Sequence, residues 1–157
     1  MKVGTVDLQK LFKEYPGTVK AQKKFNAMAK KKAADLKEAQ EDLKDFATEL
    51  RSSDSVLSAK QKRQKQNELD AKQNTYLQQE NQIKMELAAK ENEMTQSILE
   101  ELKAIVASMA KDKGVDLVLD SEKIVYLNGG IDLTDAILKS YKKSDSDSSD
   151  DTGTKKK

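Results

Sequence analysis

The chain has no cysteine and no histidine among its 157 residues. Their absence excludes disulfides and thiol chemistry, and it removes the most common metal ligands of proteins. Tryptophan is also missing, aromatic residues make up only 4% of the chain, and there is a single proline. A cysteine-free chain suits either redox compartment, so the compartment stays open. We expect no metal site and no cofactor.

Long hydrophobic runs are missing as well. No apolar stretch approaches the roughly 20 residues that a membrane-spanning helix needs. No signal peptide is visible, because Met1-Lys2 leads directly into strand-like sequence. Only 36% of the residues are hydrophobic and 36% are charged, whereas a compact globular domain is nearer half apolar. The composition favours long helices with a small core, and stability that depends on a second chain.

Catalytic signals are missing too. The sequence has no phosphate-binding loop, no nucleophile motif and no metal-ligand spacing. Its best-placed carboxylates, Asp116 and Asp120, fall on one face of an expected strand, where outward acids at a strand end explain them. We therefore predict a protein that is not an enzyme.

What the chain does have is a long polar segment with helical character. Residues 18–113 contain neither proline nor glycine and are rich in Lys, Glu, Gln and Ala. A short helix over Leu8–Tyr15 should end at Pro16-Gly17, because proline disfavours helical geometry in the preceding residue. Beyond it, apolar residues at 36, 39, 43, 46 and 50 follow the 3-4 spacing of a coiled coil. The interval of eight from Met28 to Leu36 makes the repeat slip and turns Lys32 or Ala33 toward the seam.

A break near the middle of this segment predicts a helical hairpin. Ser52–Ser55 interrupt the apolar pattern, and Ser58-x-x-Gln61 has the form of a capping box that starts a new helix. We expect the tip of the hairpin at 52–58. The returning helix has a sparse apolar stripe around 60–80 that thickens from Met94 onward. The stripe consists of Leu69, Tyr76, Ile83, Leu87, Met94, Ile98, Leu102, Ile105 and Met109.

Both ends of the chain predict strands. Residues 2–8, 115–119 and 124–127 are short and apolar, and Ser121–Lys123 could connect the last two strands tightly. Gly114 stands where a helix C-terminal glycine is expected. Asp132 and Asp135 can cap a final helix. We predict an α+β fold. We expect the chain to divide into a β-rich body of residues 1–16 and 114–143, a hairpin arm of residues 17–113, and a disordered tail of residues 144–157.

The net charge is only +2, but the positive charges are clustered. Residues 17–34 carry six lysines and no acid, and Lys60, Lys62, Arg63 and Lys65 form a second basic cluster. For any single lysine on such a face, solvation is the favoured explanation. For the set as a whole, a solvated surface and an electrostatic role have equal weight. Acidic clients or an anionic lipid surface would suit it. Nucleic acid is disfavoured, because no aromatic residues are interleaved for base stacking.

The two ends also carry a family resemblance. The segments Val6-Asp-Leu-Gln-Lys-Leu-Phe12, Val115-Asp-Leu-Val-Leu-Asp120, Ile124-Val-Tyr126 and Ile131-Asp-Leu-Thr-Asp135 resemble the Skp/OmpH family of periplasmic chaperones over about residues 2–142. The resemblance implies a homotrimer with a β-barrel body, and helical arms that hold unfolded outer-membrane β-barrel proteins without ATP. It also implies a periplasmic location. The arginine cluster that some members have, linked to lipopolysaccharide, is not matched in Glu86–Lys90.

These arguments give two sets of candidate residues. Residues of the arm and its tip could contact clients, although seam packing and stapling of the turn are competing explanations for Leu57 and the methionines. This set is Met28, Lys30, Lys31, Lys32, Phe46, Leu50, Val56, Leu57 and Met85. The residues expected in the body core and trimer contacts are Val3, Val6, Val115, Leu117, Leu119, Ile124 and Tyr126. The alternative function is a coiled-coil scaffold or adaptor that binds a folded partner.

Overall fold

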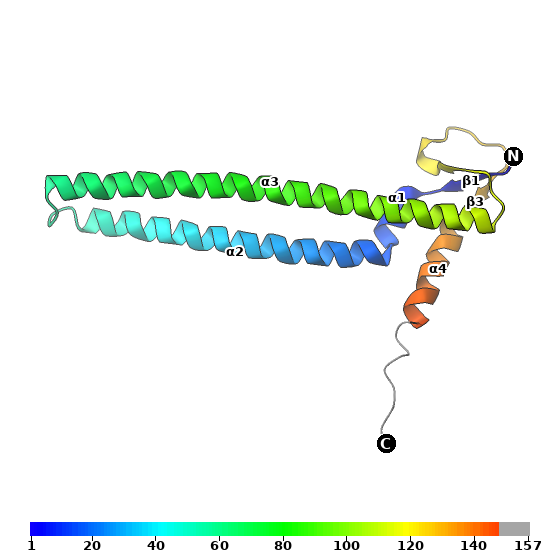
Figure 1. Cartoon of the computed structure of the whole chain (residues 1–157), viewed down its shortest axis with the longest axis horizontal. Coiled ribbons are helices and arrows are strands. Elements are labelled where there is room, and N and C mark those ends of the chain that lie inside the picture. The colour runs from blue at the N-terminus through cyan, green and yellow to red at the C-terminus, as the bar shows by residue number, and fades with distance from the viewer. Residues whose placement is uncertain (148–157) are drawn as a thin grey trace, which may run out of the picture. The chain divides into compact units, whose positions relative to one another are not determined.

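The computed structural model describes residues 1–147, with side-chain environments through Lys143. Its elements follow the chain as β1 (Val3–Val6), α1 (Leu8–Glu14), α2 (Pro16–Ser52), α3 (Ala59–Asp112), β2 (Leu117–Asp120), the 3-10 helix η1 (Ser121–Lys123), β3 (Ile131–Asp132) and α4 (Thr134–Asp147). The chain forms two compact units (Figure 1). The first comprises Met1–Lys23 and Glu93–Lys157, and the second comprises Lys24–Asn92.

The first unit contains a three-stranded parallel sheet in the order β2-β1-β3. β1 pairs with β2 from Val3 opposite Leu117 to Val6 opposite Asp120, and its other edge pairs with β3. Within the described residues the sheet is open, with β2 and β3 as its edges, and no closed barrel forms. The predicted α+β class is confirmed.

One predicted strand is wrong. Residues 124–127 form no strand; the third strand is the short β3, further along the chain. The Asp120 carboxylate accepts a hydrogen bond from the Glu122 N–H at 3.4 Å, and η1 begins there instead of a hairpin turn. The side chains of 124–127 favour a strand, but a strand also needs a neighbour. Among the described residues of this chain, that segment has none.

Helix ends agree closely with the sequence. At the start of α3, the Ser58 hydroxyl accepts from the Gln61 N–H at 3.2 Å while the Gln61 side chain accepts from the Ser58 N–H at 2.9 Å. The predicted capping box is therefore confirmed. Gly114 has a φ of 65°, which a residue with a side chain rarely adopts. Its N–H donates to the Lys111 carbonyl and the next N–H donates to the Ala110 carbonyl, as in a Schellman motif.

The C-terminal helix is longer than the sequence suggested. Disorder was expected from Ser144, but α4 continues to Asp147. The rest of the predicted tail, residues 148–157, lies outside the described residues. At the other end of α4, the Asp132 carboxylate accepts from the Thr134 N–H at 2.9 Å, as a capping acid should.

The core of the first unit is small and draws on α1, α3, α4 and the sheet. Four of its side chains are almost fully buried: Leu11, Leu102, Leu133 and Ile137. Gly4 of β1 lies against this core, and a Cβ there would come within 3.0 Å of Val115 and 3.3 Å of Leu133. A larger residue at position 4 would therefore require the Val115 and Leu133 side chains to shift.

A tyrosine hydroxyl ties α1 to α3 at the edge of this core. Tyr15 donates to the Glu101 carboxylate at 2.6 Å, and its ring packs 5.1 Å, centroid to centroid, from the ring of Tyr141. The hydrogen bond to Glu101, aided by burial and by the carboxylate charge, raises the pKa of Tyr15 to about 12. Burial also raises the pKa of Tyr141.

This bond predicts a pH dependence. The pKa of Tyr15 is higher in the folded chain than its ordinary value of 10.0. The bond therefore contributes stability at pH values below 10, and the contribution is lost as the pH rises toward 12. Ultraviolet titration of the phenolate should show a late transition that Tyr15→Phe removes. Glu101→Gln should move this transition toward lower pH.

Glu100→Gln is the matched control, because it removes an exposed carboxylate one residue away. A late transition that survives Glu101→Gln unchanged would contradict the assignment.

Candidate binding surface of the helical hairpin

The second unit is a hairpin whose two helices share a thin apolar seam. The predicted positions 36, 39, 43, 46 and 50 of α2 all fall on one half-buried face, as do Leu69 and Tyr76 of α3. No side chain of 24–52 is buried, and Ile83, 7% exposed, is the only buried one in 59–92. By contrast, the part of α3 in the first unit buries Ile98, Leu102, Val106 and Ala110. The predicted thinning of the seam is confirmed.

Two grooves flank the thin part of the seam. One, of about 430 Å³, is lined by residues that include Leu43, Tyr76 and Lys72. The other, of about 600 Å³, is lined by residues that include Leu43, Leu69 and Lys44. Leu43 is the one residue that both grooves share. The two helices are therefore joined here by a narrow apolar contact with an open groove on each side.

Where the repeat slips, a charge enters the seam. Of the two candidates, the structure selects Lys32, which is half-buried, whereas Ala33 is exposed. The Lys32 ammonium contacts the Glu86 carboxylate of α3 at 3.1 Å. An ion pair thus stands where an apolar contact would continue the seam. Glu86 could not be predicted as the partner from the sequence, because pairing across the hairpin depends on the register of the two helices.

Near the tip, two cations lie close to one aromatic ring. The ammonium groups of Lys65 and Lys72 lie 5.4 Å and 5.3 Å from the centroid of the Phe46 ring. Such contacts contribute about 0.5–1 kcal/mol at exposed sites. Phe46 also lines a cavity of about 150 Å³ with Leu50 and Leu57. The seven-residue spacing of Lys65 and Lys72 places both on one face of α3. This spacing is the sequence feature from which their proximity could have been predicted.

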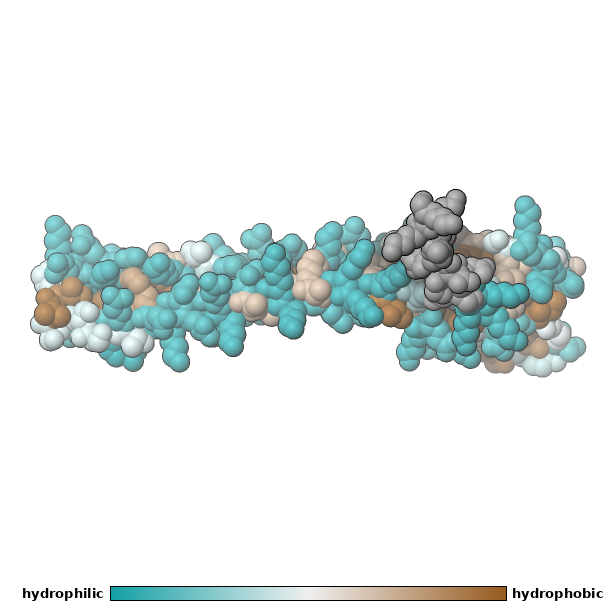
Figure 2. Space-filling view, turned by 90° about the horizontal axis from the view of Figure 1, so that it is seen from below, coloured by the Kyte–Doolittle hydropathy of each residue, from teal (hydrophilic) through white to brown (hydrophobic). Residues whose placement is uncertain are grey.

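The candidate client contacts differ in accessibility. Val56 in the tip is 81% exposed and Met85 on α3 is 74% exposed. Lys30 and Lys31 are exposed, while the rest of the set is half-buried in or beside the seam: Met28, Lys32, Phe46, Leu50 and Leu57. Figure 2 shows a mostly hydrophilic face along the hairpin, with hydrophobic surface at the end where α2 connects to α3.

The candidate body residues also divide. Val6 and Val115 are buried in the first unit, and Val3 and Ile124 are half-buried. Leu117 and Leu119 are 40% and 38% exposed, and Tyr126 is 81% exposed. The segment between β2 and β3 also exposes Val125 and Leu127, which the sequence-based set did not include. Uncovered apolar side chains are therefore found on β2 and in the segment that follows it.

Within residues 1–147 there is no group of three or more His, Cys, Asp or Glu side chains that could hold a metal ion. None of the helices in that range is long and apolar enough to cross a bilayer.

The strands of the small sheet come from both ends of the chain, and a long helical hairpin lies between them in the sequence. This order of elements defines a class of hairpin proteins with a small sheet. The chain belongs to the OmpH-like outer membrane protein family, whose model matches residues 2–141. The family predicted from the two ends of the sequence is thereby confirmed.

Individual relatives support this membership. The chain is 21% identical to chaperone protein Skp of Photorhabdus laumondii over 141 residues, which cover 90% of this chain and 86% of the relative. It is 22% identical to chaperone protein Skp of Yersinia enterocolitica, again over 90% of this chain and 86% of the relative. A solved structure described as an OmpH-like outer membrane chaperone from Caulobacter crescentus matches with a TM-score of 0.81 at 17% identity. That match covers 90% of this chain and 84% of the other, and it shows a shared fold.

The ion pair in the seam gives a stability prediction. Lys32→Ala should lower the free energy of unfolding by about 0.2–1 kcal/mol, the range of partly exposed pairs. Because salt screens such pairs, the loss should shrink as ionic strength rises. Urea denaturation at low and high salt measures it.

A double-mutant cycle with Glu86→Gln isolates the pair from the packing of the lysine stem. The neighbouring Lys31, which is exposed, supplies the control Lys31→Ala. If the coupling between Lys32 and Glu86 is zero at low salt, the pair does not stabilise the hairpin.

Proposed function

We propose that this protein is an ATP-independent holdase of the periplasm that keeps unfolded outer-membrane β-barrel proteins from aggregating. The observation that carries the proposal is membership of the OmpH-like family over nearly the whole chain, with relatives named as Skp chaperones. As the family resemblance implies, three copies would assemble through their β-rich ends. Their helical hairpins would serve as arms around one client.

The mechanism follows from many weak contacts. Each exposed apolar or basic side chain on an arm contributes only about 0.5–1 kcal/mol, and several contacts on three arms add up through effective concentration. Because no single contact is strong, contacts break one at a time and release needs no fuel. Val56, Met85, Lys30 and Lys31 are the accessible members of the candidate set.

The thin seam supplies the second part of the mechanism. Only Ile83 is buried among the α3 residues of the hairpin unit, so little apolar area resists bending or splaying of its helices. Open grooves on both flanks leave room for small changes in helix separation. An arm of this kind can adjust to clients of different size.

Met85 and Phe46 suit promiscuous binding in different ways. Met85 presents a flexible thioether to solvent, and such side chains adapt to many apolar surfaces. The Phe46 ring lies close to the Lys65 and Lys72 ammonium groups, so apolar and positive surface occur together near the tip. An unfolded chain with aromatic side chains and acids can use both.

The first functional prediction concerns aggregation. The purified protein should suppress light scattering by a urea-unfolded outer-membrane barrel on dilution, at fewer than one trimer per client. Val56→Glu combined with Met85→Glu should weaken the apparent affinity roughly tenfold, because two apolar contacts per arm are lost.

Asn81→Glu adds a charge at an exposed polar position of α3 without removing apolar surface, and it serves as the control. The absence of suppression by a trimeric wild-type protein would refute the holdase proposal. A scaffold or adaptor would ignore several unrelated unfolded barrels, whereas a holdase would bind all of them with similar affinity.

The second prediction concerns assembly. The small core and the exposed apolar residues at the sheet predict that isolated chains associate. Sedimentation equilibrium at micromolar concentration should give three times the chain mass of 17.6 kDa. A stable monomer at that concentration would rule out a shared cavity.

A further inference from the structure

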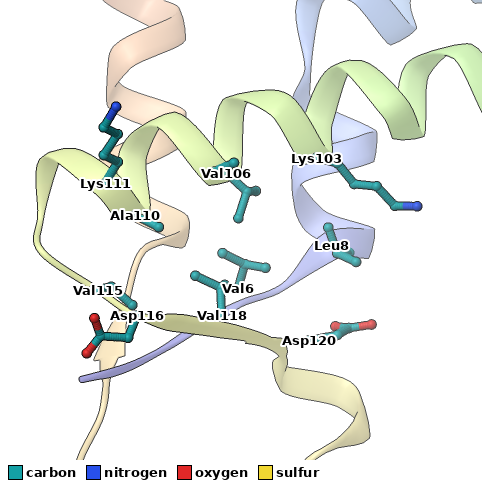
Figure 3. Close-up of a pocket in the computed structure, with 11 residues that line it drawn as sticks. Val6, Leu8, Lys103, Val106, Ala110, Lys111, Val115, Asp116, Val118 and Asp120 are labelled. Carbon is teal, nitrogen blue, oxygen red and sulfur yellow. The ribbon is translucent and has the colours of Figure 1, made fainter. Parts of the chain in front are cut away.

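The first unit has two kinds of uncovered surface. The apolar kind lines a groove of about 470 Å³ between α3 and the sheet, into which Val6, Val106 and Val118 point (Figure 3). The association of copies that the proposed function already expects accounts for that surface. The other kind is positively charged and lies at the start of α2, where its side chains take part neither in the core nor in the seam.

This positive surface, the lysine face, consists of Lys20 and Lys23 with Val19 beside them. Both lysines are exposed, and Val19 is 48% exposed. Position 23 is three residues from Lys20 and four from Val19, so the side chains share one side of the helix. Within the described part of the chain, neither ammonium group forms an ion pair. Residues 17–34 contain no acid, so this part of α2 offers no carboxylate to neutralise them.

Acids gather at the C-terminal end of α4. Asp145 and Asp147 belong to its last four residues, and its last turn has no basic residue. The C-terminus of a helix carries partial negative charge, so acids there are unfavourable unless positive charge lies near them. Asp150 and Asp151 follow directly in the sequence. Residues 144–151, the acidic stretch, therefore have four acids and no base, and a lysine-rich surface would stabilise them.

α4 brings the acidic stretch to the start of α2. The ring of Tyr141 lies 5.1 Å, centroid to centroid, from the ring of Tyr15, and α2 begins at the next residue, Pro16. Lys23 is about 11 Å further along that helix. At the other side, an extended chain carries Asp151 about 13 Å beyond the end of α4. The acidic stretch is therefore long enough to reach the lysine face of its own chain.

We propose that the acidic stretch lies on the lysine face of the same chain and occupies it until an acidic client segment displaces it. The stretch is an internal competitor, which keeps weakly charged anions off this surface and admits strongly acidic segments. The lysines at 155–157 carry the same charge as the lysine face, so the aspartates, and not these lysines, make the contact. The contact itself needs no client, whereas its role as a competitor rests on the proposed function.

A contact reporter can be built because the chain has neither tryptophan nor cysteine. Ser149→Cys carries a bimane, a dye that tryptophan quenches on contact, and Val19→Trp places the quencher on the lysine face. The fluorescence of the full chain should fall about twofold at low salt and recover as salt screens the charges. Leu77→Trp, at a 47% exposed leucine of the hairpin, is the matched control and should quench little.

Charge variants of the reporter chain show which groups make the contact. The four aspartates of the acidic stretch, changed together to asparagine, should leave the dye unquenched, and Lys20→Gln with Lys23→Gln should do the same. Glutamine at 155–157 should leave the quenching in place. Quenching that is missing at low salt, or that survives the aspartate changes, would overturn the proposal.

Dilution separates a contact within one chain from a contact between copies. Quenching should persist after the reporter chain has exchanged into an excess of wild-type chains, because dye and quencher are then on the same chain. If the excess restores the fluorescence, the occupant of the lysine face is the acidic stretch of a second copy, and the contact within one chain is wrong.

Client binding tests the role as a competitor. The aspartate-to-asparagine variant should bind an acidic unfolded barrel several-fold more tightly than the wild type at low salt, and the gain should disappear when Lys20→Gln and Lys23→Gln are added. A polyglutamate peptide should restore the fluorescence of the reporter chain. Equal client affinity of variant and wild type would refute the competitor role.

These outcomes are separable from those for the holdase. A protein that suppresses aggregation but shows no quenching would refute the contact of the acidic stretch and leave the proposed function standing. A protein that shows salt-sensitive quenching but no suppression would keep the contact and refute the holdase.

Discussion

The interaction on which the rest of the structure depends is the narrow apolar contact between α2 and α3. In the hairpin unit it is carried by half-buried residues such as Leu43 and Tyr76, with one buried side chain, Ile83. Hydrophobic burial scales with apolar area. A seam of this width therefore holds two helices side by side without fixing their separation firmly. The polar surface that surrounds it keeps the long helices in water, and the few exposed apolar residues are left available for weak contacts.

The first unit, unlike the hairpin, has a well-buried core. Leu102, Leu133 and Ile137 are almost fully buried, while the edge of its sheet and the segment at Ile124–Leu127 are uncovered. A small domain has little apolar area to stabilise it, so burial of this surface against other copies, as in the proposed trimer, would add to its stability. For the proposed holdase, firm association at this end would complement compliance in the hairpin, because such a protein has to hold clients of varied size.

The sequence predicted local features well. The capping box at Ser58 and Gln61, the glycine at 114 and the slip that turns Lys32 or Ala33 toward the seam all follow from spacing and backbone chemistry, which act over a few residues. The family was likewise identified from the chain ends. Features that depend on register were not predicted: the Glu86 partner of Lys32, and the cations around Phe46. The strand at 124–127 was wrong for a related reason, since propensity specifies an extended segment but not its partner.

Amide hydrogen exchange along α3 tests the central claim most directly, because the claim concerns where this one helix is held firmly. Protection should be high around Leu102 and Val106, and it should fall by orders of magnitude over residues 60–80, with an intermediate value near Ile83. This gradient should persist in the assembled protein without client. Uniform protection along α3 would contradict the account, because it would mean that the thin seam does not make the hairpin compliant.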